Sequence, residues 1–239
     1  MNPCQLVPAS HFTLEQLVEA YNHTRVDYMV PMPMNAARLA EYIHVYDVDM
    51  EQSVVAVDGE RVLGLAMLGV RPDRAWVTRL GVLPNRRRRG VGEALLLYLL
   101  AASDRLGISL VTLDVIKGNL PAHTLFVKWG FHETREMIIL RRPPGPPQHT
   151  AAGRCRWLSR AEALAVAQTR PRPLTWINDT ASLAHADCVL GLTVNLPCGS
   201  RGWLVFQKHR YYLTRLTMAT VEGDPTAVGR ALFYYLYQA

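Results

Sequence analysis

The chain lacks the cysteine pattern of a disulfide framework or a zinc site. Its 239 residues include only Cys4, Cys155, Cys188 and Cys198, and no two of them form a Cys-x-x-Cys pair. Disulfide-stabilised domains and zinc sites need closely and regularly spaced cysteines. We therefore expect reduced, structural thiols and no metal centre.

Long apolar runs are also missing. No stretch of eighteen apolar residues occurs, and residues 1–5 lack the charged and apolar regions of a secretory signal. These absences predict a cytoplasmic protein without a membrane span. With 49% hydrophobic and 19% charged residues, the chain is typical of globular proteins and long enough for one large or two smaller domains.

Lysine is scarce, because the net charge of +6 comes almost entirely from arginine, with lysine only at Lys117, Lys128 and Lys208. A basic chain raises the hypothesis of nucleic-acid binding. However, the densest arginine cluster lies in a single glycine-rich loop, and no helix-turn-helix, zinc-finger or RNA-recognition pattern is present. We do not expect a nucleic-acid partner.

That loop is the most informative segment. Residues 76–82 predict a strand, residues 86–89 are all arginine, and Gly90 and Gly92 open a predicted helix. Glycine lets the backbone approach a bulky anion, and the first N–H groups of a helix point at it. Guanidinium groups add bidentate donors. The segment predicts phosphate binding, although the charge alone also fits a solvated loop.

Two spacings resemble the GNAT N-acetyltransferase superfamily. Arg-x-x-Gly-x-Gly over residues 87–92 resembles its acetyl-CoA signature, and Asn-x-x-Ala-x-x-Leu-Phe-x-x-x-Gly-Phe over residues 119–131 resembles its second CoA-contacting segment. The resemblance covers residues 4–142. It implies an α/β fold, with a mixed, mostly antiparallel central sheet, a splayed parallel strand pair and flanking helices.

The resemblance implies acetyl-CoA as cosubstrate, with pantetheine between strands 76–82 and 109–115, which separate beside a bulge. Gly81 independently indicates a bulge or a close backbone approach, and Asn119 also fits a plain helix cap. The implied contacts are main-chain groups of Leu80, Gly81 and Val82 for pantetheine, those of Arg87, Arg88, Arg89, Gly90, Val91 and Gly92 for pyrophosphate, and Asn119 and Phe126 on the next helix.

The implied reaction is direct transfer of an acetyl group to a primary amine of a small molecule or peptide. The family's usual acid and base fall at Phe126 and Trp76, which exchange no protons. We predict that His123 and Asp114 substitute for them, although a surface histidine is the commoner explanation of His123 and a solvated carboxylate fits Asp114 equally well. A catalytically idle CoA-binding or regulatory module therefore stays open as the alternative function.

The acceptor pocket is expected near the polar stretch at residues 42–49. Tyr42, His44 and Tyr46 would line it, and Asp47 and Asp49 would favour a cationic acceptor. Solvated residues at a helix end explain this stretch equally well.

Residue patterns predict strands at 5–7, 53–58, 61–68, 76–82 and 109–115, and helices at 13–22, 35–45, 93–102 and 119–129. Residues 131–134 and 137–140 are expected to close the sheet as two further strands. This order of elements agrees with the fold that the resemblance implies.

Residues 143–153 are rich in proline and predict a linker between a domain at 1–142 and a smaller α/β half-domain at 154–239. The half-domain repeats two segments of the first domain: residues 78–80 recur at 214–216, and residues 91–98 recur at 228–235. Chance alignment is the alternative. Since residues 221–227 contain carboxylates and no arginine, we interpret it as a degenerate GNAT-like unit without a CoA site. It would line the acceptor pocket or mediate a homodimer.

Overall fold

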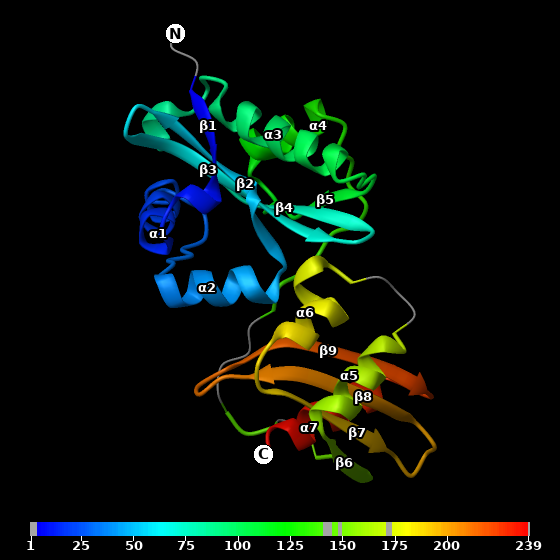
Figure 1. Cartoon of the computed structure of the whole chain (residues 1–239). Coiled ribbons are helices and arrows are strands. Elements are labelled where there is room, and N and C mark those ends of the chain that lie inside the picture. The colour runs from blue at the N-terminus through cyan, green and yellow to red at the C-terminus, as the bar shows by residue number, and fades with distance from the viewer. Residues whose placement is uncertain (1–3, 141–144, 148–149, 171–173, 239) are drawn as a thin grey trace. The chain divides into compact units, whose positions relative to one another are not determined.

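The computed structural model describes residues 4–140, 145–147, 150–170 and 174–238. The chain divides into two units, Met1–Met137 and Ile138–Ala239, each with its own sheet (Figure 1). The end of the expected first domain at residue 142, and part of the expected linker at 143–153, lie outside the described residues.

The first unit is built on a five-stranded sheet with the order β1-β2-β3-β4-β5. All neighbours are antiparallel except the parallel pair β4–β5. Figure 1 shows α3 and α4 on one side of this sheet and α1 and α2 on the other. The elements are β1 (Gln5–Pro8), α1 (Leu14–His23), α2 (Ala36–Val45), β2 (Val48–Asp58), β3 (Arg61–Arg71), β4 (Arg74–Val82), α3 (Val91–Arg105), β5 (Val111–Leu113) and α4 (Leu120–Lys128).

Helices on both faces explain the long apolar runs in the central strands. A strand covered on one face alternates apolar and polar residues, whereas a strand covered on both is apolar throughout. In β3, every side chain from Leu63 to Leu68 is buried. The core on the α3 side is formed by Val54, Ala56, Leu63, Ala66, Leu68, Ala75, Val77, Val82, Leu95, Leu96, Leu99 and Ala102, among others.

Local capping fixes where the helices begin. Thr13 and Gln16 form the capping box that their spacing predicts, with Thr13 N–H donating to Gln16 Oε1 at 2.9 Å. Asn35 Oδ1 accepts from Arg38 N–H at 2.9 Å and caps α2. Asn119 Oδ1 accepts from Ala122 N–H at 3.4 Å and caps α4.

The two strands expected at 131–134 and 137–140 are not formed, and that prediction is wrong. Residues 131–140 have no regular structure. The expected strand at 109–115 is only three residues long, so it offers a short edge for further pairing. Ile138, Ile139 and Leu140 are 82–86% exposed, which shows that this apolar segment finds no ladder partner among the described residues. A strand needs such a partner, because its backbone hydrogen bonds are made with a neighbouring strand.

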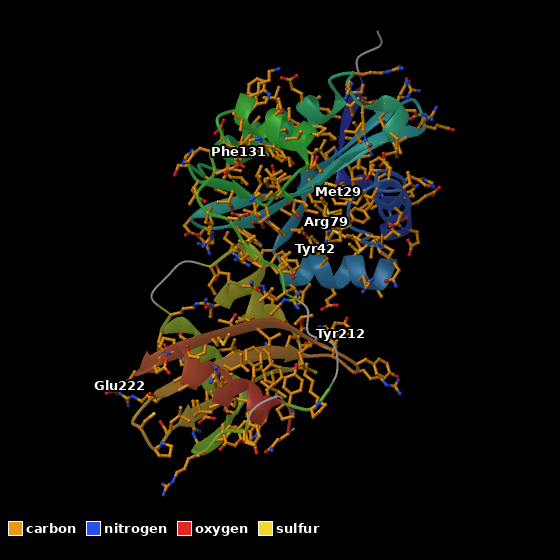
Figure 2. The ribbon with its side chains drawn as sticks, turned by 180° about the vertical axis from the view of Figure 1, so that it is seen from behind. Met29, Tyr42, Arg79, Phe131, Tyr212 and Glu222 are labelled. Carbon is orange, nitrogen blue, oxygen red and sulfur yellow. The ribbon has the colours of Figure 1, made fainter. Side chains whose placement is uncertain are left out.

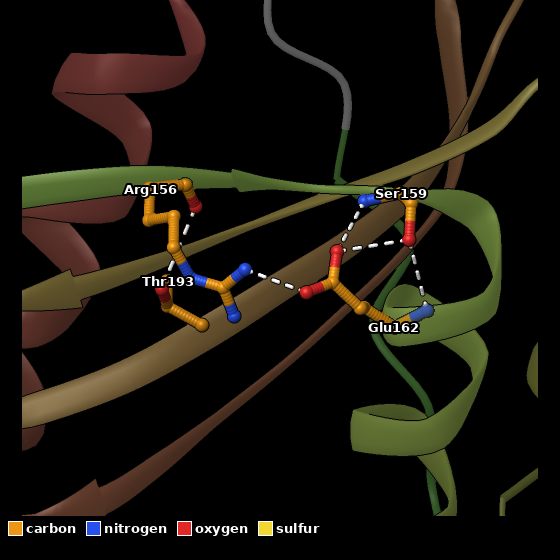
Figure 3. Close-up of polar contacts among 4 residues, drawn as sticks. All are labelled: Arg156, Ser159, Glu162 and Thr193. Atoms are coloured by element: carbon orange, nitrogen blue, oxygen red, sulfur yellow. Dashed lines mark hydrogen bonds and ion pairs between the residues drawn. The ribbon is translucent and has the colours of Figure 1, made fainter.

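The second unit carries a four-stranded antiparallel sheet with the order β6-β7-β8-β9. Its elements are β6 (Arg154–Leu158), α5 (Arg160–Gln168), α6 (Thr180–His185), β7 (Val189–Asn195), β8 (Arg201–Lys208), β9 (Leu213–Glu222) and α7 (Pro225–Leu236). A second capping box opens α5: Ser159 N–H and Oγ both donate to Glu162 Oε2 at 2.8 Å, and Arg156 pairs with the other carboxylate oxygen at 2.6 Å (Figure 3).

The two units follow the same order of elements, namely strand, two helices, three strands and a helix. Each also has a non-glycine residue in the left-handed region directly before its second strand, Asp47 at φ 54° and Cys188 at φ 51°. The Asp47 carbonyl accepts from Val70 N–H, and the Cys188 carbonyl accepts from Lys208 N–H. The order of elements and this backbone detail are thus shared by the two units, and the interpretation of residues 154–239 as a degenerate copy stays a prediction.

No helix in the described part of the chain is long and apolar enough to cross a membrane.

Candidate active site

The parallel strands β4 and β5 separate in the middle of the first unit. They pair at only three positions, of which Val77 with Leu113 is the last. Strand β4 continues to Val82, while β5 ends. Beyond Val77, one edge of β4 therefore has no neighbouring strand among the described residues.

A β-bulge lies at the same place. Thr78 is opposite Met67 and Gly81 is opposite Leu65, so Arg79 and Leu80 together oppose the single residue Ala66. Arg79 has a φ of 55°, in the left-handed region. A bulge bends its strand and re-aims side chains. The separated strand pair that the resemblance implies is thus present.

Gly81 allows a close approach between β4 and the end of α1. A Cβ atom added to Gly81 would lie 2.4 Å from Thr24 Oγ1 and 2.9 Å from Thr24 Cβ. The Thr24 hydroxyl is buried and donates to the Tyr21 carbonyl at 2.7 Å. The glycine is thus explained by packing, next to the bulge rather than inside it.

Two arginine side chains reach carbonyl oxygens of β4. Arg25 donates to the Leu80 carbonyl at 3.3 Å, and Arg87 Nε donates to the Val82 carbonyl at 3.2 Å. Each carbonyl oxygen retains a second lone pair for another donor. The segment implied for pantetheine is therefore partly engaged by the protein's own side chains.

The loop after β4 leads into an uncapped helix start. Gly90 is the N-cap of α3 with φ 81°. Since glycine has no side chain, no side-chain hydrogen bond caps this helix. The N–H groups of Val91, Gly92 and Glu93 therefore have no acceptor within the helix, and the positive end of the helix dipole lies behind them. Space around Gly90 is open, since an added Cβ would meet no atom within 4 Å. This is the geometry of an anion site.

Arg87 does not serve this site in the way its position predicts. Its guanidinium forms a two-pronged ion pair with Asp27 at 2.6 and 2.7 Å and donates to the Thr24 carbonyl at 3.1 Å. The hydrogen bonds between the two side chains lower the pKa of Asp27 and raise the pKa of Arg87. The Arg87 side chain thus fastens the α1–α2 loop to β4, and the implied main-chain contact of Arg87 with pyrophosphate stays a prediction.

Of the remaining arginines, Arg86 lies 3.9 Å from Asp58, across an exposed ion pair. Arg88 and Arg89 are exposed and make no ion pair within the described residues. Arg88 has a φ of 58°. The guanidinium groups that are free for a phosphate are therefore those of Arg88 and Arg89.

Asp114 follows directly after the last paired residue of β5. Its Oδ2 accepts from the Trp76 indole N–H at 3.2 Å. Although the residue as a whole is exposed, neighbouring atoms crowd its carboxyl group, and this partial loss of water raises the pKa of Asp114. A carboxyl group at the point of strand separation with a raised pKa suits a proton acceptor.

His123 lies on α4 and is half exposed. Its Nε2 is 2.9 Å from Glu133 Oε1, in a contact on the protein surface. Phe126, on the same helix, is 8% exposed and packs edge-on against Phe131 at 5.9 Å between centroids. Trp76 is 3% exposed and contacts the rings of Tyr42 and Tyr46. Phe126 and Trp76 are therefore core residues here.

Tyrosine rings and the Arg79 guanidinium cluster on the side of β4 that faces α1 and α2. Tyr42 OH lies 2.5 Å from Thr78 Oγ1, and burial raises the pKa of Tyr42 to about 12, so this hydroxyl stays neutral. The Arg79 guanidinium lies 4.1 Å above the Tyr42 ring and donates to Tyr21 OH at 2.9 Å. Figure 2 places Arg79, Tyr42 and Met29 in the same region of the unit.

The acidic acceptor pocket expected from Asp47 and Asp49 is not formed, and that expectation is corrected. Asp47 pairs with the buried Arg71 at 2.7 Å. Asp49 Oδ1 accepts the backbone N–H groups of Glu51 and Gln52. Both carboxylates therefore have structural roles.

Sequence reasoning missed the residues at and after the end of α1 that contact β4 and Arg87. Arg25, Asp27 and Thr24 carry no motif, because their roles arise from the packing of the α1–α2 loop on β4. Arg79 did have one signal, its recurrence at Arg215 within the internal repeat.

A central sheet whose parallel strands separate beside a bulge, next to an uncapped helix start, defines the class of CoA-dependent acyltransferases. Residues 14–131 match the model of the acetyltransferase (GNAT) family, so this segment is a GNAT acetyltransferase domain, a kind of domain that takes its acetyl group from acetyl-CoA. No curated protein matches the chain by sequence.

Three solved structures are each similar to part of this chain. A transcriptional regulator from Bacillus halodurans C-125 is 17% identical, with 58% of this chain and 99% of that chain covered and a TM-score of 0.47. The ribosomal-protein-S18-alanine N-acetyltransferase from Escherichia coli is 20% identical, with 55% and 79% covered and a TM-score of 0.45. An aminoglycoside antibiotic 6'-N-acetyltransferase from Acinetobacter haemolyticus is 16% identical, with 59% and 99% covered and a TM-score of 0.46. At these identities and scores, the similarity says nothing about the substrate.

Proposed function

We propose that the first unit transfers the acetyl group of acetyl-CoA directly to a primary amine. The observation that carries this proposal is the continuity between the unpaired edge of β4, from Thr78 to Val82, and the uncapped start of α3 at Gly90. An extended amide chain fits the first feature as an added strand, and a pyrophosphate fits the second. The exposed Arg88 and Arg89 would add donors to the phosphates.

In the proposed reaction, the amine nitrogen attacks the thioester carbonyl, so that a C–N bond forms and the C–S bond breaks. One proton moves overall from nitrogen to sulfur. We assign the Val82 N–H to the developing oxyanion, since β4 presents main-chain groups at this edge. Holding the two reactants in line contributes roughly 7 to 11 kcal/mol toward the barrier without any acid or base.

We assign Asp114 as the group that accepts the amine proton. It lies where β4 and β5 separate, its exposed position allows exchange with water, and its raised pKa makes it a stronger base than an ordinary carboxylate. His123, paired with Glu133, remains a prediction for the second proton transfer.

The test is turnover with a panel of primary amines, followed through the release of free CoA thiol. Direct transfer requires initial-rate lines that intersect when both substrates are varied. Parallel lines indicate an acetyl-enzyme intermediate and would contradict direct transfer. Asp114→Asn is expected to lower kcat strongly, and His123→Ala with an unchanged pH profile would remove His123 from the mechanism.

A CoA-binding module without catalysis is the second candidate. Buried Trp76 and Phe126 stand where the family often has a base and an acid, and neither side chain exchanges a proton. This candidate predicts that acetyl-CoA binds and that no amine in the panel is acetylated.

A further inference from the structure

The bulge in β4 places the Arg79 guanidinium on the face of the sheet that α2 covers. Trp76 and Thr78 lie on the same face. Arg79 adopts φ 55° there, which is unfavourable for a residue with a long side chain. Its guanidinium lies against the rings of Tyr42, at 4.1 Å, and Tyr21, at 5.3 Å. The bulge thus holds one arginine over an aromatic surface beside the point of strand separation.

A second cation contacts the same surface. The Arg25 guanidinium lies 4.6 Å from the centre of the Tyr21 ring and 4.7 Å from that of Tyr28. It donates to the carbonyl of Leu80, the other residue of the bulge. Tyr21 is therefore in contact with both Arg25 and Arg79.

Neither arginine has an anionic partner among the described residues. The nearby Asp27 pairs with Arg87, and Asp47 pairs with Arg71. In addition, the Nε–H groups of both Arg25 and Arg79 are buried and without an acceptor in the described part of the protein. Such unsatisfied donors on charged groups are costly in a native fold.

The aromatic rings compensate the charges only in part. Cation–π contacts offset only part of the cost of removing a guanidinium from water, and they satisfy no N–H group. An oxyanion supplies what is missing, because it accepts several N–H donors and neutralises charge at once. Tyr42, which Arg79 contacts, is hydrogen-bonded to Thr78 and packs against Trp76, whose indole donates to Asp114. The arginines therefore share a face of the sheet with the group proposed to accept the amine proton.

We propose that Arg25 and Arg79 bind a carboxylate of the acceptor, so that the enzyme acetylates an amine whose molecule also carries a carboxylate. This inference rests on the proposed function and specifies its substrate class. The acceptor is then amino-acid-like or a peptide with a free carboxylate.

The experiment uses matched amine pairs, each an amino acid or dipeptide and its carboxamide, with rates compared per unprotonated amine. The carboxylate member is expected to have a kcat/KM at least about tenfold higher, because a charge-assisted hydrogen bond contributes about 1.5 to 3 kcal/mol. In Arg79→Met and in Arg25→Met the preference should fall toward unity through KM. The affinity for acetyl-CoA should be unchanged in Arg79→Met, whereas Arg25→Met also frees the Leu80 carbonyl in the segment implied for pantetheine. A preference that is absent, or that survives both substitutions, would overturn the proposal.

Arg215→Met is the matched control. Arg215 has φ 53° in an equivalent bulge of β9, where Thr214 is opposite Gln207 and Thr217 is opposite Val205. Because it belongs to the second unit, its substitution should leave the carboxylate preference intact. The melting temperature of each variant reports loss of folding separately.

A phosphate-bearing amine and its dephosphorylated form give a further arm. A preference confined to this pair would overturn the carboxylate assignment in favour of a phosphate. If acetyl-CoA binds and no amine is acetylated, the proposed function fails by itself. Calorimetry of the same carboxylates with CoA-saturated protein then decides the inference: binding lost in Arg79→Met supports an anion site, and the absence of binding contradicts it.

Discussion

Substitution of Gly81 by alanine tests the packing that shapes the β4 edge. The added Cβ would lie 2.4 Å from Thr24 Oγ1 and 2.9 Å from Thr24 Cβ. An ordinary contact is about 3.4 Å or longer, so β4 or the end of α1 must move by up to about 1 Å. Thr24 yields poorly, because it is 3% exposed, its hydroxyl is hydrogen-bonded to Tyr21, and its carbonyl accepts from Arg87.

The expected cost is that of overpacking a filled interior, about 1 to 3 kcal/mol. Alanine offsets part of this through its smaller backbone entropy in the unfolded chain, by about 0.4 to 1 kcal/mol. A net loss of about 1 to 2 kcal/mol should speed hydrogen exchange in β4 and α1 roughly 5- to 30-fold. Peptide-level exchange measured by mass spectrometry separates this effect from the second unit.

Two comparisons make the test specific. Gly229→Ala, on α7, meets no atom within 4 Å and should stabilise its helix by about 1 kcal/mol. In the double variant Gly81→Ala with Thr24→Ala, the closest contact is removed, so the combined loss should be smaller than the sum of the single losses. Unchanged exchange in Gly81→Ala, or strictly additive losses, would refute the packing argument.

Five further substitutions probe the site and the second unit. If Asp114 accepts the proton, kcat/KM of the wild type should fall as the pH decreases through the raised pKa of Asp114. A pH–rate profile of Asp114→Asn should lack this acidic limb, and its rate should be about 10²- to 10⁴-fold lower. Arg88→Gln and Arg89→Gln should each weaken acetyl-CoA binding about 3- to 10-fold in calorimetry, whereas Arg87→Gln should chiefly speed exchange in the α1–α2 loop. Hydrogen bonding with Arg156 and with the Ser159 cap lowers the pKa of Glu162 to about 2. The stabilising effect of ionised Glu162 should thus be complete above its unfolded-state pKa near 4.5 and disappear as the pH falls toward 2. In urea titrations, Glu162→Gln should therefore be less stable than the wild type at pH 7 and equally stable below pH 2.

Much of the first unit is predictable because its signals are local. The capping box at Thr13 and the cap at Asn119 place helix starts within one residue. The apolar runs of β2 to β4 predict strands, since a strand buried on both faces needs no alternation. By contrast, the apolar run at 137–140 predicts a strand that does not form, because strand formation depends on a partner edge that the run itself does not specify.

The site divides in the same way. The uncapped start of α3 at Gly90 follows from adjacent residues and is predictable. Which arginine is free to bind phosphate is not, because Arg87 is engaged by Asp27, sixty residues away. The pairs formed by Asp47 and Asp49 likewise depend on tertiary packing, and for that reason their sequence positions misled the expectation of an acidic pocket.

Titration of the purified chain with acetyl-CoA by calorimetry tests the central claim most directly. We expect one binding site per chain, with affinity reduced in Arg88→Gln and Arg89→Gln and retained in Arg215→Met. No binding heat together with an unchanged melting temperature would contradict it, and so would two sites per chain.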